Sequence, residues 1–238
     1  AAALKNEICS ISLATKIQKV LILCGSGNNG ADGYALARLI SGSFKTCVFE
    51  CGKPSSPLCV LQAERARLCG VSVLEADSFF AENLDSAVVV DCIFGSGFKG
   101  GFTDQNGEKL INLLAFVNSS ECLKIACDVP TGLHADGTLA QSVFKADVTL
   151  TMGAQKFCLY SDMAKNFTGK IKVCELGISR ELFEKSAENL EESQKNLFLL
   201  EQKDMILPYR TDNLVNKGSF GNAYIACGEK SGASIIAA

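Results

Sequence analysis

The glycine-rich stretch from Val20 to Gly33, VLILCGSGNNGADG, contains the residues whose types and spacing most directly suggest chemistry. Apolar residues lead into a tight turn, and a helical pattern follows it. The first N–H groups of a helix have no partner within the helix, so a strand, a turn and a helix start together form an anion site. Gly25, Gly27 and Gly30 match G-x-G-x-x-G, and Glu50 ends the next predicted strand, where a ribose-binding acid would lie. Taken alone, this stretch predicts a nicotinamide-dependent oxidoreductase.

Two residue types in the same stretch argue against a plain dinucleotide turn. Asp32 places a carboxylate at the expected helix start, where a pyrophosphate needs positive potential. Asn28 and Asn29 add two amides that such a turn does not need. The stretch therefore favours a more polar ligand, with a cation as one alternative.

Acidic residues also close two later strands. Asp91 lies near the end of SAVVVDCIF and precedes the glycine-rich segment 95–101, while Asp128 is followed by Thr131. A carboxylate at the end of a buried strand is costly to desolvate unless it is paired or bound to a cation. An acid that only caps the N–H groups of a turn is the simpler alternative. Together with Asn29, these residues supply hard oxygen ligands for a monovalent or hard divalent cation.

Within the segment 95–101, Lys99 supplies a mobile positive charge suited to a phosphate. Three further side chains near these segments are weaker candidates. His134 has no nucleophile signature beside it and is interpreted as a surface loop residue. Lys156, in TMGAQKFC, is either a substrate contact or a solvated loop lysine. Glu50 is interpreted as a strand-end acid, given the arguments against a dinucleotide turn.

The elements that must position these residues alternate between strand and helix. Continuously apolar, β-branched strands predict an α/β protein with a mainly parallel sheet that is covered on both faces. The ligand crevice of such a sheet lies beyond the carboxyl ends of its strands, which selects the loops 25–33, 95–103 and 130–138. Strands are expected at 20–24, 46–50, 71–74, 87–94, 123–129, 146–152 and 170–176, and helices at about 1–18, 32–42, 56–69, 78–84, 105–118 and 179–194.

The composition disfavours several classes of protein. The 238 residues carry a formal net charge of −3, which gives no electrostatic case for binding nucleic acid or an anionic membrane. No apolar run approaches the ~18 residues that span a bilayer, and no signal-peptide pattern is visible. Most of the 12 cysteines lie in apolar strand patterns, without a C-x-x-C pair. They predict reduced thiols in a reducing, cytoplasmic compartment and disfavour a zinc site.

The character of the chain changes after Leu200. Residues 1–200 form the first predicted domain, and residues 201–238 begin as a charged linker with one proline. The segment AYIACG at 223–228 suggests the first strand of a second domain. One strand and the start of a helix cannot bury a core, so this second domain is expected to be incomplete. We expect both ends of the chain to be cut.

Four motifs, GSGNNGADG, VVDCIFGSGFKGG, ACDVPTGLHADG and ADVTLTMGAQK, occur in this order. Over about Val20 to Ile178 the chain resembles the NAD(P)H-hydrate epimerase family, which implies a Rossmann-like three-layer α/β/α fold. The segment NKGSFGNAYIACGEKSGASIIAA resembles the opening of the ribokinase-like ADP-dependent NAD(P)H-hydrate dehydratase domain. This order is that of bifunctional repair enzymes, which interconvert the S and R forms of hydrated NADH or NADPH and dehydrate the hydrate back to the cofactor.

The resemblance also implies ligands and residue roles. Asn29, Asp91 and Thr131 would hold a potassium ion, and ADP would serve only the missing dehydratase part. Asp128 would be the general acid/base, because burial at a strand end raises the pKa of a carboxylate toward the working pH. The hydrate would contact Asn28, Asn29, Gly30, Ala31, Asp32, Gly95, Ser96, Gly97, Phe98, Lys99, Gly100, Gly101 and Asp128.

Departures from the family pattern are small within the motifs. Ala31 stands where many members carry glycine, and the leading helix is expected to be only the tail of a longer element. The resemblance implies a small-molecule substrate, implies no nucleic-acid or membrane partner, and leaves a homo-oligomer open. Epimerase-like domains also occur as non-catalytic interaction scaffolds, which tend to lose the acids. Asp32, Asp91 and Asp128 all remain here, which favours an enzyme.

Overall fold

The computed structural model describes residues 1–13, 16–102, 105–177, 179, 182, 199–200, 202–204, 214–216 and 219. The chain divides into two units, Ala1–Ser179 and Arg180–Ala238. In the second unit, the described part contains a 3-10 helix, η5, at Gln202–Asp204. The helix predicted at 179–194 and the strand predicted at 223–228 lie outside the described residues, apart from Ser179 and Leu182. The predicted domain boundary after residue 200 and the ribokinase-like second domain therefore stay predictions.

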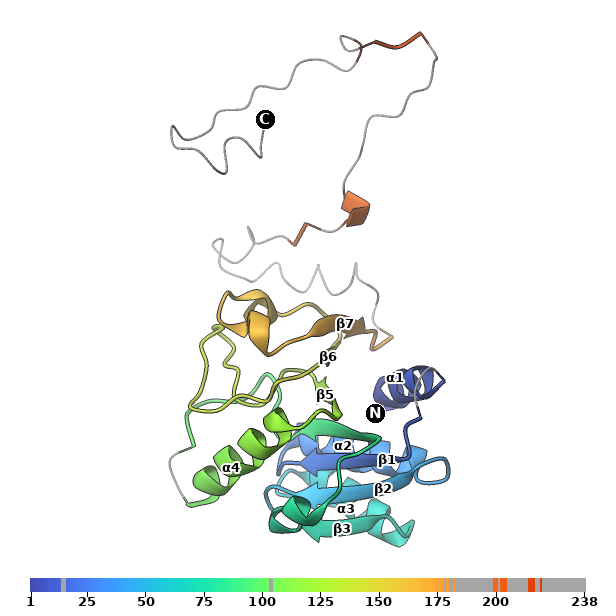
Figure 1. Ribbon diagram of the computed structural model, residues 1–238, viewed down its shortest axis with the longest axis vertical. Helices are drawn as coiled ribbons and strands as arrows, with labels where there is room; N and C mark the ends of the chain where they lie inside the picture. Colours follow the sequence, from blue (N-terminus) through green and yellow to red (C-terminus); the bar gives the residue numbers. More distant parts are fainter. Residues whose placement is uncertain are drawn as a thin grey trace. The chain divides into compact units, whose positions relative to one another are not determined.

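The first unit is organised around a seven-stranded sheet in the order β3-β2-β1-β4-β5-β6-β7, and every neighbouring pair is parallel (Figure 1). The strands are β1 Lys19–Cys24, β2 Lys45–Glu50, β3 Ser72–Glu75, β4 Ala87–Cys92, β5 Leu123–Cys127, β6 Val148–Met152 and β7 Lys170–Cys174. The strand order reverses between β1 and β4, so the sheet has a topological switch point there. The predicted parallel α/β architecture is confirmed.

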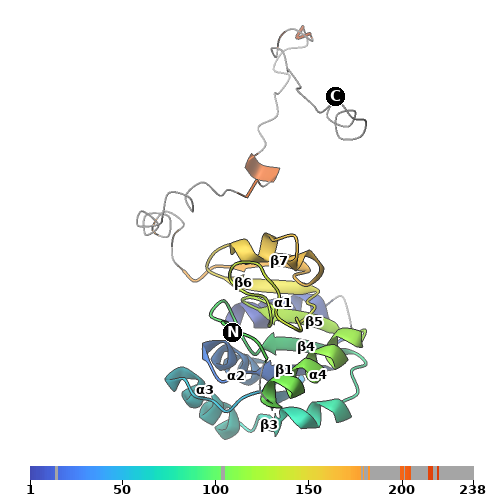
Figure 2. The same ribbon diagram turned by 90° about the vertical axis from the view of Figure 1, so that its left-hand side faces the viewer.

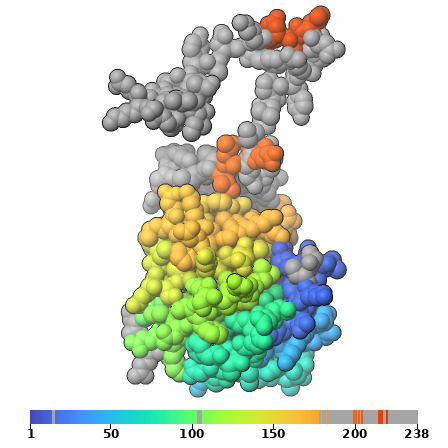
Figure 3. Space-filling model, viewed as in Figure 1, coloured from blue at the N-terminus to red at the C-terminus, as the bar shows by residue number. Residues whose placement is uncertain are grey.

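Helices cover both faces of this sheet, as Figure 2 shows for α2 and α3 on one side and α4 on the other. The α-helices are α1 Ala2–Ser12, α2 Asn28–Ile40, α3 Pro57–Leu68 and α4 Gln105–Ser119. Three short 3-10 helices complete the unit: η1 Ala76–Ala81, η2 Phe157–Tyr160 and η3 Ala164–Asn166. In the space-filling view the green residues of α4 lie on the surface beside the blue-green residues of η1 (Figure 3).

Alternation along the strands divides the core into two layers. In β1, Val20 and Ile22 pack with buried residues of α1 and α2, whereas Leu21 and Leu23 pack with buried residues of α4. Successive side chains of a strand point to opposite faces, and all four of these positions are apolar because both faces are covered. The continuous apolar runs in the sequence thus have a direct structural cause.

Several predicted element boundaries are wrong by a few residues. The helix α1 ends at Ser12 rather than near residue 18, and α2 begins at Asn28, four residues before the expected start at Asp32. The segment predicted as a helix at 78–84 is the 3-10 helix η1. Strand β5 ends at Cys127 because Asp128 takes a left-handed φ of 71°. The early start of α2 and the early end of β5 matter most, because both boundaries lie at the loops that form the site.

Two further observations concern the environment of the chain. Among the described helices, none combines the length and the apolar character needed to cross a bilayer. The eleven cysteines within the described part of the chain carry free thiols, and seven of them are buried. The predicted cytoplasmic location itself stays a prediction.

Candidate active site

A cavity of about 590 Å³ opens at the carboxyl edge of the sheet, beyond the ends of β1, β4, β5 and β6. This is the edge at which open parallel sheets bind ligands. Residues of two of the predicted loops, 25–33 and 95–103, line the cavity together with Asp128, whereas no residue of the third predicted loop, 130–138, lines it. Its lining residues are Ser26, Gly27, Asn28, Asn29, Asp32, Ile93, Phe94, Gly95, Ser96, Gly97, Phe98, Asp128, Met152 and Lys156.

The glycines of the first motif allow the start of α2 to approach the strands closely. A Cβ atom on Gly25 would lie 2.0 Å from the carbonyl oxygen of Ile93, and one on Gly30 would lie 2.0 Å from the carbonyl oxygen of Gly25. A Cβ atom on Gly33 would lie 2.5 Å from the sulfur of Cys24, whereas one on Gly27 would meet nothing within 4 Å. The G-x-G-x-x-G match thus reflects close backbone packing, so by itself it is weak evidence for a dinucleotide fingerprint.

Asp128 lies at the centre of the polar contacts in the cavity. Its Oδ2 accepts a hydrogen bond from the Ser96 N–H at 3.1 Å, and its Oδ1 accepts one from the Met152 N–H at 3.2 Å. A Cβ atom on Gly95 would lie 3.1 Å from Asp128 Oδ2 and 3.5 Å from Asn29 Cγ. Glycine at position 95 therefore leaves the space in which the Asp128 carboxylate and the Asn29 amide approach one another.

Lys156 completes the environment of this carboxylate. Its Nζ lies 2.7 Å from Asp128 Oδ1, and it also donates to Thr151 Oγ1 at 2.8 Å and to the Met152 carbonyl oxygen at 3.1 Å. The exposed side-chain fractions are 22% for Lys156 and 14% for Asp128, so the pair is largely screened from water. Of the two interpretations of Lys156 from the sequence, the solvated loop lysine is wrong.

The ion pair reverses the expected direction of the Asp128 pKa. Burial alone would raise the pKa of Asp128, as the sequence suggested. The hydrogen bond and charge of Lys156, with the N–H groups of Ser96 and Met152, outweigh burial and hold the pKa below its ordinary value of 3.8. The expectation of a raised pKa is therefore wrong, and Asp128 is an anion at neutral pH.

Asp91 lies beneath the cavity and braces two of its loops. Its side chain is fully buried, and it accepts hydrogen bonds from the Thr131 N–H at 2.7 Å, the Thr131 hydroxyl at 2.7 Å and the Ile93 N–H at 3.1 Å. The Thr131 hydroxyl in turn accepts from the Phe94 N–H at 3.0 Å. Burial raises the pKa of Asp91 to about 6, although these hydrogen bonds lower it. No basic side chain of the described residues pairs with this carboxylate.

The oxygen atoms of the side chains around these loops are of the kinds that bind a potassium ion. Asp91 supplies a buried carboxylate without a cationic partner, Thr131 a hydroxyl and Asn29 an amide, which are hard oxygen ligands. The Asn29 Nδ2 atom is buried without a hydrogen-bond partner, and as a donor it would bind an acceptor such as a substrate oxygen, whereas only the amide oxygen could bind the ion. Within the described residues there is no cluster of three or more His, Cys, Asp or Glu side chains that could hold a metal ion, so an ion here would also need the amide and hydroxyl oxygens.

Comparisons with known proteins identify the family of this chain. Residues 1–158 match the family described as YjeF-related protein N-terminus. The chain belongs to this family. It is 42% identical over 241 residues to the bifunctional NAD(P)H-hydrate repair enzyme Nnr of Helicobacter pylori, in an alignment that covers 100% of this chain and 48% of that protein. The chain therefore spans about half the length of that relative.

Shorter relatives in the family match over most of their own length. The NAD(P)H-hydrate epimerase of Elusimicrobium minutum is 35% identical over 202 residues, which cover 76% of this chain and 83% of that protein. The crystal structure of yeast YNL200c superposes with a TM-score of 0.59 and 25% identity, covering 71% of each chain.

The family motifs do not all reach the cavity. Of the thirteen residues predicted to contact the hydrate, eight line it: Asn28, Asn29, Asp32, Gly95, Ser96, Gly97, Phe98 and Asp128. Gly30 and Ala31 are buried within α2, and Lys99, Gly100 and Gly101 are exposed in the loop before α4 without lining the cavity. Asp91 and Thr131 lie in the layer beneath it. The roles assigned to these residues stay predictions.

Two other side chains acquire defined surroundings. The imidazole of His134 stacks on the ring of Phe98, with 5.0 Å between centroids and 12° between planes. Glu50 Oε1 accepts hydrogen bonds from the Tyr34 hydroxyl at 2.6 Å and from Arg67 at 2.5 Å. His134 therefore supports one wall of the cavity, and Glu50 links β2 to α2 and α3.

Proposed function

We propose that this domain epimerises the hydrates of NADH and NADPH, inverting the ring carbon that carries the hydroxyl group. The observation that supports this most directly is the ion pair of Asp128 and Lys156 on the wall of the 590 Å³ cavity. The name of the Elusimicrobium minutum relative, which this chain covers over 83% of its length, supports the same reaction.

The pair offers both groups that the inversion needs. The carbon can invert by ring opening or by loss and return of water, and each route needs one group to accept a proton and one to donate it. Asp128 is held as an anion by its three hydrogen-bond donors, so it is the acceptor or the counter-charge for a cationic ring. Lys156 is the donor, and because the proton returns at the end of the cycle, the pair is restored.

Potassium has a supporting role in this proposal. Asn29, Asp91 and Thr131 would hold the ion, whose charge would offset that of the buried Asp91 carboxylate and of a substrate phosphate. In a chain as long as the Helicobacter pylori relative, the domain would precede an ADP-dependent dehydratase that restores the cofactor, and ADP would belong to that part.

The test is to follow the two hydrate epimers by chromatography after supplying one of them, with and without protein, in potassium and in tetramethylammonium buffer. We expect the protein to speed equilibration of the epimers, and Asp128→Asn to abolish this while the variant keeps its thermal unfolding transition. Asp85→Asn, an exposed acid that does not line the cavity, is the matched control. Full activity of Asp128→Asn would show that the assignment is wrong.

A further inference from the structure

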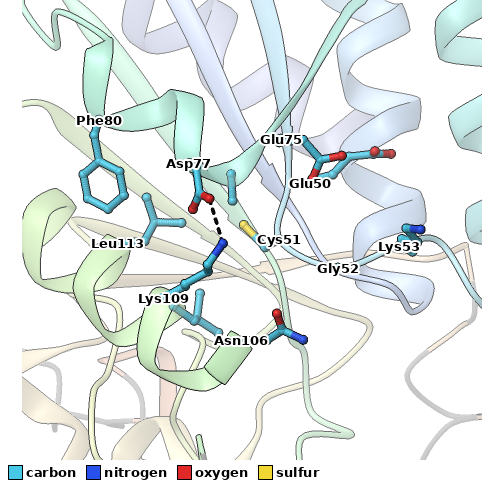
Figure 4. Close-up of a pocket in the computed structure, with 12 residues that line it drawn as sticks. Glu50, Cys51, Gly52, Lys53, Glu75, Asp77, Phe80, Asn106, Lys109 and Leu113 are labelled. Carbon is cyan, nitrogen blue, oxygen red and sulfur yellow. Dashed lines mark hydrogen bonds and ion pairs between the residues drawn. The ribbon is translucent and has the colours of Figure 1, made fainter. Parts of the chain in front are cut away.

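A second cavity, of about 410 Å³, opens at the same carboxyl edge of the sheet, beyond β2 and β3. Segments from four elements form it: the loop after β2, the end of β3 with the first turns of η1, and one side of α4 (Figure 4). Its volume lies in the range of about 300–1,000 Å³ that is typical of small-molecule sites. Its lining residues are Glu50, Cys51, Gly52, Lys53, Glu75, Ala76, Asp77, Phe80, Asn106, Lys109, Leu110 and Leu113.

The lining combines apolar surface with polar groups. Leu110 and Leu113 are 7% and 2% exposed, whereas Phe80 is 45% exposed, although its ring contacts that of Phe116 with 5.4 Å between centroids. An exposed aromatic ring above buried leucines is the surface on which a flat heterocycle stacks. In the view of Figure 4, Phe80 and Leu113 lie to one side of the Asp77–Lys109 ion pair.

The polar groups in this cavity are suited to the rest of a nucleoside. Glu75 and Lys53 are exposed, and neither side chain makes a hydrogen bond or an ion pair within the described part of the chain, although the charge of Glu75 acts on Lys109. A carboxylate accepts the hydrogen bond of an exocyclic amino group or a ribose hydroxyl, and a lysine attracts a phosphate. Lys109 reaches from α4 to Asp77 at 2.7 Å, and both side chains are more than 60% exposed, so this pair is open to a competing ligand.

The turn after β1 separates this cavity from the candidate active site. Ser26 lines the first cavity, and its carbonyl oxygen accepts hydrogen bonds from the N–H groups of Ser55 and Ser56. These two serines follow Lys53, which lines the second cavity. A Cβ atom on Gly52, which lines the second cavity, would lie 3.6 Å from Ser26. The two cavities are thus neighbours across one turn: the first lies at the switch point between β1 and β4, and the second lies on the β2–β3 side of it. Dinucleotides bind across that point, with one nucleotide on each half of the sheet.

We propose that the second cavity binds the adenosine half of the hydrated dinucleotide, with the adenine ring against Phe80 and the pyrophosphate crossing the turn at Ser26. This inference rests on the proposed function and adds to it a subsite for the adenosine half of the substrate, so that the domain takes the whole dinucleotide hydrate in preference to the nicotinamide mononucleotide hydrate. The proposal also makes Glu50, at the end of β2, part of a nucleotide site, even though the glycines of the first motif are explained by close backbone packing.

The experiment compares two substrates, the hydrate of NADH and the hydrate of reduced nicotinamide mononucleotide, which lacks the adenosine half. We expect kcat/KM for the dinucleotide to exceed that for the mononucleotide by about tenfold or more, the effect of one stacked base. Phe80→Ala should lower this ratio by about tenfold. Leu58→Ala, which removes a 56% exposed apolar side chain on α3 away from both cavities, should leave the ratio unchanged.

Binding of AMP, measured by isothermal titration calorimetry, provides a second readout that does not depend on activity. Binding to the wild-type chain that weakens in Phe80→Ala and in Lys53→Ala supports the proposal. Equal kcat/KM for both substrates together with no AMP binding overturns it, even if epimerisation is fast. Absence of epimerisation with either substrate contradicts the proposed function instead, so the two failures are distinguishable.

Discussion

Replacement of Lys156 by methionine is the sharpest test of the ion pair at the candidate active site. The three N–H donors of the ammonium group have three acceptors: Asp128 Oδ1, Thr151 Oγ1 and the Met152 carbonyl oxygen. Methionine has a similar length and volume, so Lys156→Met removes the charge without leaving a large cavity. Asp128 keeps its hydrogen bonds from Ser96 and Met152 but loses its only ionic partner among the described residues.

The expected magnitude follows from the burial of the pair. With 22% and 14% of the two side chains exposed, the lost bond is a charge-assisted one in a largely screened site, about 1.5–3 kcal/mol. If that interaction acts in the transition state, kcat/KM falls by about 10- to 150-fold, since each 1.36 kcal/mol is tenfold. Lys165→Met is the matched control, because its pair with Asp162 is exposed and should change neither the rate nor the stability measurably.

The pH dependence separates the two ways in which Lys156 can act. The wild-type Asp128 pKa is lowered, so its ionised form contributes stability above the ordinary value of 3.8, and this contribution is lost as the pH falls through the folded-state pKa. The difference in unfolding free energy between wild type and Lys156→Met should therefore be full at pH 7 and shrink below about pH 4.

The kinetic profile gives the complementary reading. In the variant, burial is no longer offset by Lys156, so the acidic limb of kcat/KM should move to higher pH. Recovery of the rate at higher pH would mean that Lys156 only keeps Asp128 ionised, whereas a rate that stays low at every pH would mean that Lys156 also donates the proton. A variant with the wild-type rate and pH profile would refute the role of the pair.

Three further predictions test the supports of the site. Gly30→Ala should lower the unfolding free energy by about 2 kcal/mol or more, because its Cβ would lie 2.0 Å from a backbone oxygen. Gly27→Ala should lower it by only about 1 kcal/mol or less, because its Cβ would meet nothing within 4 Å and only the preference for glycine over alanine at a helix N-cap is lost; urea unfolding measures both. Thr131→Val should cost about 1.5–3 kcal/mol, because it removes a hydroxyl bonded to Asp91, and Thr131→Ser should restore most of this in the same assay. Potassium should raise the thermal midpoint of the wild-type chain relative to tetramethylammonium, and Asp91→Asn should abolish the difference; an equal rise in both would exclude Asp91 as a ligand.

Much of the fold could be predicted because local pattern and tertiary environment agree. The strand β4 is apolar at Val88, Val89 and Val90 because helices cover both faces of the sheet, and such a run indicates a buried parallel strand. The ends of elements were harder to predict. Strand β4 stops at Cys92 rather than residue 94, because the Phe94 N–H leaves the sheet and donates to the Thr131 hydroxyl. Thr131 also donates to Asp91, which lies forty residues earlier in the sequence. A contact over that sequence distance leaves no local signal.

The residues of the candidate site were predicted unevenly for the same reason. Asp128 and Asn29 could be found, since polar residues after apolar strands must lie at the carboxyl edge. Lys156 could not be ranked, because it lies four residues beyond the end of β6 and only the loop geometry turns its ammonium group back to Asp128. The direction of the Asp128 pKa shift was therefore also predicted wrongly, because Lys156 is a main cause of the lowering. Burial is readable from a sequence pattern, but the partner that outweighs it is not.

The two acids at the strand ends show how one edge can divide its tasks. Asp91 does not line the cavity, and its carboxylate accepts three hydrogen bonds from Thr131 and Ile93. It therefore fixes the loops after β4 and β5 relative to each other. Asp128 lines the cavity and is paired with a lysine, so it can exchange a proton with a ligand. If both acids were catalytic, Asp91→Asn would abolish epimerisation as fully as Asp128→Asn does. If Asp91 only holds the loops, the variant loses stability, and its residual rate per folded molecule stays well above that of Asp128→Asn.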